Sequence, residues 1–325
     1  MTKSTKEKNT VTIFDVAKEA GVSYSTVSRV ANGYQFVKPA TRQKVEDAMK
    51  RLGYVANLKA RSLAGGRSQV IGLLVYDFQT SYLVEIVRGI DNEVSRLDYD
   101  MMLSTTHQKK ESDHVRKLAQ GMVDGLLIVL PSNLDAYVED LSRQNIPYVL
   151  IDYAGNEMPN ANTVQSTNHQ GAYEATSYLL QLGHKKLGFI SGNMAVGASR
   201  ARLAGFKQAL AEHSVSINPD WVKTGDFQEP SGYLAGKQLV STPNHPTAVF
   251  SSNDVMAFGA ITAFQEAGLS VPQDISIIGF DDIPEASYMR PKLTTVRQPL
   301  QDMGRNATKI LVNQIEQPGS PPSQI

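Results

Sequence analysis

A stripe of polar side chains recurs at helical spacing between residues 12 and 32. Tyr24, Ser25, Ser28 and Arg29 fall on one face of a predicted helix. Their hydroxyls and guanidinium are groups that hydrogen bond to phosphates and base edges of DNA, and arginine commonly makes a bidentate contact with guanine. Arg29 is therefore the expected guanine reader. The alternative interpretation is an ordinary helical hairpin with a solvated polar face.

Two short predicted helices joined by a tight turn hold this stripe. Thr12 and Asp15 have the spacing of a capping box, Gly21 ends the first helix, and Ser23 is placed to cap the second. The apolar positions of both helices fall on facing sides and are Val16, Ala17, Ala20, Val27, Val30 and Ala31. This is the pattern of a helix-turn-helix, whose second helix enters the major groove with its N-terminal residues at the base edges.

A third helix is predicted to begin near Pro39 and to stop at Gly53, with an apolar stripe of Val45, Met49 and Leu52. Three helices in roughly 50 residues bury only a modest core, so we expect this bundle to be tethered to a larger body.

From Gln69 onward, short apolar runs alternate with helical patterns. Runs such as GLLIVL are apolar throughout, which indicates strands covered on both faces and hence parallel sheets with right-handed crossovers. The cycle repeats after Asn160. The predicted fold class is α/β, with an N-terminal three-helix domain followed by two doubly wound parallel-sheet subdomains.

Polar side chains follow the predicted strands, at the edge of a parallel sheet where ligands bind. Arg202 lies one turn into its helix, and the residues after the strands are Asp77, Asp152, Phe227, Asn253, Asp254, Asp281 and Asp282. Several acceptors, a strong donor and an aromatic face suit a polyhydroxylated ring. The alternatives are that Asp77 and Asp254 only cap the next helix, and that Arg202 and Asp281 form a structural salt bridge.

Composition limits the class of protein. The 325 residues have no Cys and are 41% hydrophobic, and no apolar run reaches the length of about 18 residues that a membrane span needs. With no secretory leader, a cytoplasmic protein is expected. The formal net charge of zero is split between residues 1–68, with 13 Lys/Arg against 5 Asp/Glu, and an acidic remainder. A basic head suits contact with phosphate, although Lys3, Lys6 and Lys8 alone are typical of a solubilising tail.

Motifs for catalysis, nucleotides or metals are weak. Gly192 and Gly197 imitate phosphate-loop spacing but lack the following Lys, and no GxGxxG follows a strand. The six His show no paired ligand spacing. We therefore expect no catalytic residues, no metal and no cofactor.

The runs DVAKEAGVSYSTVSRVANG and VKPATRQKVEDAMKRLGYVANLKARSLAGG resemble the LacI/GalR family of bacterial transcription repressors, and the resemblance spans the whole chain. It implies a helix-turn-helix domain at 1–56, a hinge helix and linker at 57–66, and a periplasmic-binding-protein-like effector and dimerisation core at 67–325, with subdomains at about 67–163 plus 297–325 and about 164–296. In NLKARSLA, Leu63 matches the leucine that opens a base step, and Ala60 allows the partner hinge helix to approach. The implied DNA contacts are Thr12, Ser23, Tyr24, Ser25, Thr26, Ser28, Arg29, Asn32, Asn57, Ala60 and Leu63.

The same resemblance assigns an effector site. SRARLAGF matches the family's effector arginine at Arg202, SNDVMAFGA matches Asn253 and Asp254, and GFDDI matches Asp281. Phe227 falls where relatives carry a stacking aromatic residue, and Asp152 where many carry an acidic contact. The implied effector residues are Asp77, Tyr82, Asp152, Arg202, Phe227, Asn253, Asp254 and Asp281.

The chain departs from the family in three places. FQTSY replaces a common Asn-Pro-Phe-Phe type turn, which puts the pocket contributions of Thr80 and Tyr82 in question, and Thr167 replaces a common acidic residue. The sequence ends at PPSQI, whereas relatives run on through a last strand.

These observations predict a ligand-responsive repressor that binds a pseudo-palindromic operator as a homodimer, with a sugar as effector and no membrane partner. One alternative is a repressor that responds to a purine corepressor. Another is a sugar-binding transport receptor of the same two-lobed fold, which the helix-turn-helix disfavours.

Overall fold

The structure of the protein is a computed structural model that describes residues 11–31, 34, 36–54, 67–75, 78–106, 111–119, 121–131, 135–153 and 160–325. The chain divides into two compact units, a small one of Met1–Gln69 with Gln120–Val123 and a large one of Val70–Ala119 with Asp124–Ile325. Within the described residues, no helix is both long and apolar enough to cross a membrane.

The described residues of the small unit form three helices, α1 (Ile13–Ala20), α2 (Tyr24–Ala31) and α3 (Pro39–Leu52). The predicted capping box is confirmed, because the backbone N–H of Thr12 donates to Asp15 Oδ2 at 2.8 Å and the N–H of Asp15 donates to Thr12 Oγ1 at 3.4 Å. Gly21 ends α1 in the left-handed conformation at φ 65°, as expected. The fully buried core residues come from all three helices and are Val16, Val27, Val45 and Ala48.

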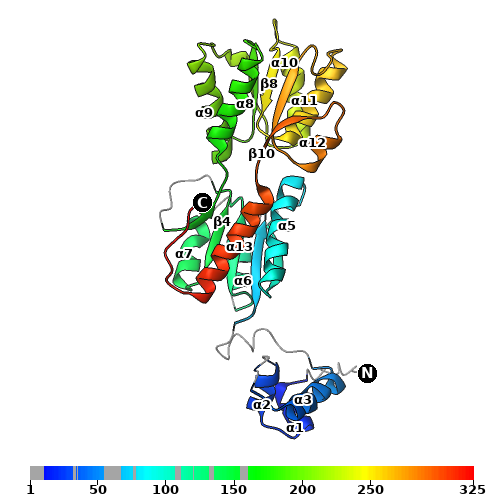
Figure 1. Cartoon of the computed structure of the whole chain (residues 1–325), viewed down its shortest axis with the longest axis vertical. Helices are drawn as coiled ribbons and strands as arrows, with labels where there is room; N and C mark the ends of the chain where they lie inside the picture. The colour runs from blue at the N-terminus through cyan, green and yellow to red at the C-terminus, as the bar shows by residue number, and fades with distance from the viewer. Residues whose placement is uncertain are drawn as a thin grey trace, which may run out of the picture. The chain divides into compact units, whose positions relative to one another are not determined.

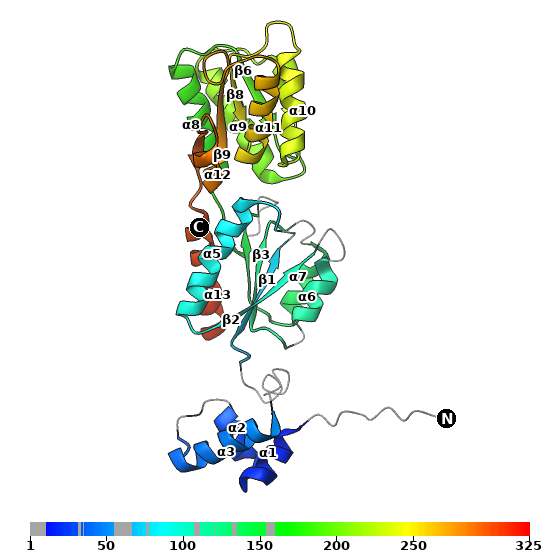
Figure 2. The ribbon, with the colours of Figure 1, turned by 90° about the vertical axis from the view of Figure 1, so that its right-hand side faces the viewer.

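The large unit has two lobes, each built on a five-stranded parallel sheet. In the first lobe the strand order is β2-β1-β3-β4-β5. Figure 2 shows α5 and α13 covering one face of this sheet, while α6 and α7 cover the other. The elements are β1 (Val70–Val75), α5 (Ser81–Arg96), β2 (Asp100–Thr105), α6 (Glu111–Ala119), β3 (Gly125–Val129), α7 (Asp135–Arg143), β4 (Tyr148–Ile151), β5 (Asn162–Val164) and α13 (Leu300–Glu316).

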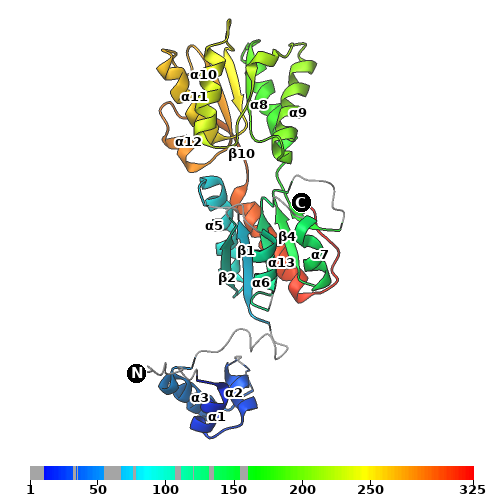
Figure 3. The same ribbon diagram turned by 180° about the vertical axis from the view of Figure 1, so that it is seen from behind.

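The second lobe repeats this plan with the strand order β10-β9-β8-β6-β7. Its helices flank the sheet in two groups, α8 with α9 and α10 with α11 (Figures 1 and 3). The elements are α8 (Asn168–Gln181), β6 (Leu187–Ser191), α9 (Gly197–Glu212), the 3-10 turn Pro219–Trp221, β7 (Val222–Thr224), α10 (Glu229–Val240), β8 (Ala248–Ser251), α11 (Asp254–Glu266), β9 (Ser276–Asp281), α12 (Pro284–Tyr288) and β10 (Thr294–Arg297).

The two helix pairs of the second lobe are packed in the same way, through a glycine at the contact between the helices. A glycine of the later helix presses on the backbone of the earlier one, Gly205 against α8 and Gly259 against α10, and neither position has room for a Cβ. The same pairs are joined by tyrosine hydroxyls that donate to glutamates at 2.6 Å, Tyr173 to Glu212 and Tyr233 to Glu266. Close helix packing of this kind fixes where the loops at the ends of the strands lie.

The chain passes between the lobes next to two short edge strands. β5 belongs to the first sheet and leads into α8, while β10 belongs to the second sheet and leads back into α13. The last residues lie beside β5, where the backbone N–H of Ile325 donates to the carbonyl of Thr163 at 3.0 Å. The predicted fold class is confirmed, including the two parallel-sheet subdomains.

Candidate functional site

The outer face of α2 is exposed and polar. Tyr24, Ser25 and Arg29 are exposed, whereas Ser28 is half-buried. As predicted, Ser23 caps the helix, with its Oγ accepting from the N–H of Thr26 at 3.2 Å. The Ser23 hydroxyl also lies 2.9 Å from Ser25 Oγ and 2.8 Å from Thr26 Oγ1. The N-terminal end of α2 therefore presents a row of hydroxyl groups to its surroundings.

One residue beside this face is absent from the predicted contact set. Phe14, in the first turn of α1, is 67% exposed, and its ring centroid lies 5.7 Å from that of Tyr24. Phe14 lies off the buried stripe of Val16 and Ala17, so a large aromatic residue on the polar side of α1 was the available sign. The two rings add an apolar platform next to the hydroxyl row.

Five predicted contact residues lie outside the described residues. They are Asn32, Asn57, Ala60 and Leu63 of the DNA-binding set and Asp77 of the effector set.

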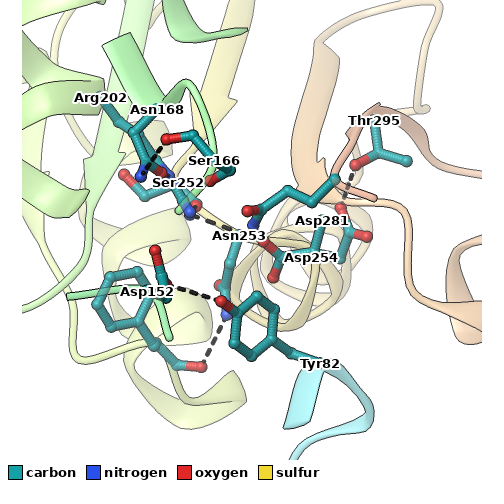
Figure 4. A network of polar contacts seen from close by, with 12 residues as sticks. Tyr82, Asp152, Ser166, Asn168, Arg202, Ser252, Asn253, Asp254, Asp281 and Thr295 are labelled. Carbon is teal, nitrogen blue, oxygen red and sulfur yellow. Dashed lines mark hydrogen bonds and ion pairs between the residues drawn. The ribbon is translucent and has the colours of Figure 1, made fainter. Parts of the chain in front are cut away.

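The large unit holds a buried polar cluster, which we define as Tyr82, Asp152, Arg202, Asn253, Asp254 and Asp281 (Figure 4). Arg202 is 3% exposed and comes from α9. Its Nε donates to Asn168 Oδ1 at 2.8 Å, and its Nη1 donates to the carbonyl of Ser252. The guanidinium carbon lies 3.8 Å from the ring centroid of Phe280. These contacts hold Arg202 with its charge inside the lobe.

Asp281 ends β9 and faces that charge. Its Oδ1 lies 3.7 Å from Arg202 Nη1 and accepts a hydrogen bond from Gln298 Nε2 at 2.6 Å. Burial raises the pKa of the Asp281 carboxyl well above its usual value, and the attraction of Arg202 opposes this rise. A donor brought by a ligand would favour the ionised form.

The first lobe contributes Tyr82 and Asp152 to the cluster. The Tyr82 hydroxyl donates to Asp152 Oδ2 at 2.7 Å. Burial and the neighbouring Asp152 raise the pKa of the Tyr82 phenol well above its usual value, with smaller electrostatic effects from Asp281 and Arg202 of the second lobe. A hydrogen bond from Ser81 to Glu285 also joins the lobes. Groups from both lobes are therefore close enough to act on one another.

Asn253 of the cluster is bonded to Phe227, an aromatic residue that lies beside the cluster. Asn253 Oδ1 caps α11 by accepting from the N–H of Met256 at 2.9 Å, and its Nδ2 donates to the carbonyl of Phe227 at 3.0 Å. Phe227 has φ 72°, and its ring lies over Gly192, where a Cβ would overlap it. The glycine that imitates a phosphate loop in the sequence thus makes room for this ring.

Asp254 joins two segments of the second lobe through hydrogen bonds to its carboxyl group. Its Oδ2 accepts from the N–H of Ile283 at 3.0 Å, and its Oδ1 accepts from Thr295 Oγ1 at 2.5 Å. Burial raises the pKa of its carboxyl to about 7. The side-chain cap of α11 is Asn253, so Asp254 instead ties α11 to the segment after β9 and to β10.

The buried polar atoms without a hydrogen-bond partner among the described residues include Asp152 Oδ1, Ser166 Oγ and Ser252 Oγ, and also Oε1 of Gln298, whose Nε2 bonds to Asp281. Ser166 follows β5 and Ser252 follows β8, so the end of a strand was the sign by which sequence analysis could have found both. Figure 4 shows both serines beside Arg202 and Asn168. Such atoms are positions where a polar ligand regains hydrogen bonds lost to water. Among the described residues, no group of His, Cys, Asp or Glu could hold a metal ion.

Comparison with known proteins gives the same picture. Residues 12–57 match the family described as bacterial regulatory proteins, lacI family, and residues 176–325 match the periplasmic binding protein-like domain. The HTH-type transcriptional repressor PurR of Photobacterium profundum is 38% identical over 309 residues, covering 94% of this chain and 92% of the relative. PurR of Haemophilus influenzae is 40% identical over 309 residues, covering 94% of this chain and 91% of the relative.

Solved structures of other regulators also match nearly the whole chain. The lac repressor dimer bound to operator and the anti-inducer ONPF has a TM-score of 0.83 at 30% identity, covering 97% of this chain and 96% of that one. A complex of the transcriptional regulator CelR with cellobiose has a TM-score of 0.75 at 31% identity, with the same two coverages.

A helix-turn-helix unit joined to a two-lobed sensor with a buried polar cluster defines a ligand-responsive transcriptional repressor. The chain belongs to the LacI/GalR family of bacterial transcription repressors, as its motifs predicted.

Proposed function

We propose that this repressor binds a pseudo-palindromic operator as a homodimer, and that binding of a sugar changes its affinity for that operator. The predicted set from Thr12 to Leu63 makes the DNA contacts, with a hinge at 57–66. The predicted effector set, extended by Ser166 and Ser252, binds the sugar. The relatives are transcription repressors, and we propose no enzymatic activity for this chain.

The choice of a sugar rests on the unpartnered buried atoms of Asp152, Ser166 and Ser252. A buried polar atom left without a partner costs about 1–3 kcal/mol. Asp152 Oδ1 needs a donor when the carboxylate is ionised, while the hydroxyls of Ser166 and Ser252 can donate or accept. Sugar hydroxyls also do both, so a single polyhydroxylated ring can satisfy all three atoms.

The remaining groups of the cluster suit the two sides of such a ring. Arg202 supplies charged N–H donors and Asp281 supplies a carboxyl acceptor, a pair that fits two adjacent hydroxyls. The ring of Phe227 offers an apolar face for the C–H groups of the sugar.

The cluster draws on both lobes, which provides the coupling to DNA. Tyr82 and Asp152 belong to the first lobe, while Arg202 and Asp281 belong to the second. An effector that contacts both pairs favours one arrangement of the lobes over another. A coupling free energy of about 1–3 kcal/mol would change operator affinity about 5- to 150-fold.

A purine corepressor is the second candidate. It is favoured by the PurR relatives, which are 37–40% identical over most of the chain. A purine would stack its flat face on Phe227 but brings fewer hydroxyl-type donors to Asp152, Ser166 and Ser252.

A thermal-shift panel of mono- and disaccharides and purine bases tests the choice, with each hit then measured for its effect on binding to the DNA upstream of the gene. We expect a saccharide to raise the melting temperature and to change DNA affinity. Ser252→Ala removes a hydroxyl that makes no hydrogen bond to the described residues, so it should weaken the sugar while leaving the ligand-free melting temperature nearly unchanged. A response confined to purines would overturn the sugar assignment.

A further inference from the structure

The segment after the recognition helix carries two exposed aromatic side chains that the DNA-binding set does not include. Tyr34 is 53% exposed and Phe36 is 89% exposed. Exposed aromatic side chains are common on protein surfaces, so the exposure alone does not indicate a role. For Tyr34, the contacts of its ring and backbone do indicate one.

Tyr34 lies beside Arg29. The guanidinium carbon of Arg29 is 5.9 Å from the centroid of the Tyr34 ring. This distance is within the range over which a cation is attracted to the negative face of an aromatic ring. Because Arg29 is exposed on α2, the ring provides a surface against which its side chain can rest.

The chain holds Tyr34 in place from three directions. Its backbone N–H donates to the carbonyl of Arg29 at 2.9 Å, which ties Tyr34 to the end of α2. Its own carbonyl accepts from Arg42 Nη2 of α3 at 2.6 Å. Its ring meets that of Phe36 edge to face, with centroids 5.9 Å apart. The backbone of Tyr34 is thus tied to both α2 and α3, and its ring contacts Arg29 and Phe36.

We propose that Tyr34 is a positioning residue for Arg29 and holds the guanidinium in the orientation that reads a base pair. This inference rests on the proposed function, in which Arg29 contacts a base edge. A bidentate contact with guanine requires the planar guanidinium to lie in the plane of the base. Fixing an arginine side chain otherwise costs conformational freedom, and a preformed orientation removes part of that cost.

We expect the substitution of Tyr34 to change base preference rather than overall affinity for DNA. Replacing the ring by an aliphatic side chain removes the attraction but keeps bulk and charge. An exposed interaction of this kind corresponds to roughly a 2- to 5-fold change in preference per half-site, and to the square of that for a symmetric dimer site. Affinity for random duplex should change little, because phosphate contacts dominate it.

Selection from a duplex library randomised over about 20 base pairs, enough for two half-sites, tests the proposal on the full-length protein. The variants are Tyr34→Phe, which keeps the ring beside Arg29 and serves as the control, and Tyr34→Leu, Tyr34→Gln and Arg29→Lys. We expect Tyr34→Phe to select the wild-type sequences. Tyr34→Leu and Tyr34→Gln should lose preference at the same base positions as Arg29→Lys, while each melts like the wild type.

The outcomes separate the inference from the function on which it rests. If Arg29→Lys selects the wild-type sequences, Arg29 does not read a base. That result would contradict both the positioning role of Tyr34 and the base contact of Arg29 in the proposed function. If Arg29→Lys loses a position that Tyr34→Leu and Tyr34→Gln retain, the positioning role is wrong and the proposed function stands. Should Tyr34→Leu fold poorly, the polar Tyr34→Gln decides between these results, since Tyr34 is more than half exposed.

Discussion

The exposed face of α2 and the buried polar cluster of the large unit use similar residues under opposite conditions. On α2, Ser23, Ser25 and Thr26 bond mainly to their neighbours in sequence and face solvent. In the cluster, Arg202 and Asp254 are almost fully buried and bond to residues far along the chain. We expect substitutions of the exposed side chains that do not cap a helix to disturb the fold little, whereas substitutions in the cluster should affect folding and, as proposed, effector binding together.

The largest expected effect in this comparison belongs to Arg202→Ala. The substitution removes the bonds to Asn168 and Ser252 and leaves Asp281 buried without its cation. Breaking a buried pair in this way typically costs about 3–5 kcal/mol of unfolding free energy. Urea unfolding of the large unit measures it, and loss of the effector response should accompany it.

Arg200→Ala is the matched control, because Arg200 is exposed on the same helix and bonds to the nearby carbonyls of Met194 and Ala195. If the two alanine variants unfold at the same urea concentration, the buried cluster does not contribute to stability as described.

Asp254→Asn should change how stability depends on pH. Burial raises the pKa of Asp254 to about 7, above its value of 3.8 in an unfolded chain. The folded state therefore binds a proton more tightly, so this contribution is complete below about pH 4 and is lost as the pH rises through about 7. The wild type should lose stability on the order of a few kcal/mol over that interval because of this group.

Asparagine carries no proton to lose, and its amide keeps an acceptor for the N–H of Ile283. The melting temperature of Asp254→Asn relative to the wild type should therefore rise between pH 4 and pH 7 and then level off. Asp274→Asn, at an exposed aspartate outside the cluster, is the control. A difference that stays flat with pH would contradict the raised pKa.

These contrasts explain how much of the fold and the site could be predicted from the sequence. The capping box at Thr12, the stop at Gly21 and the parallel strands rest on spacing within short segments, and the structure has all of them. The role of Asp254 depends on Thr295, and that of Gly192 depends on the ring of Phe227. Such pairs are set by packing between distant segments, which local spacing does not encode.

Thr12→Ala tests an interaction that is set within a short segment, the N-cap of α1. It removes the hydroxyl that receives the N–H of Asp15 and donates to its carboxylate. Loss of an N-cap typically costs about 1 kcal/mol, which should appear as a lower melting temperature of the small unit. Thr12→Ser keeps the hydroxyl and should restore the melting temperature; failure of serine to do so would show that the cap is not the cause.

The smallest effect on stability is expected for Arg29→Ala, where the exposed face should separate folding from binding. An exposed substitution usually changes the unfolding free energy by less than about 0.5 kcal/mol, whereas a lost guanine contact removes about 1–3 kcal/mol of base discrimination. Arg51→Ala is the control, because it removes one positive charge from α3 at a site paired with exposed Glu19. Arg51→Ala should weaken binding to operator and random duplex equally, while Arg29→Ala should weaken operator binding more. Equal losses for both variants would mean that α2 contributes charge alone, and the distinction between a reading face and a basic surface would fail.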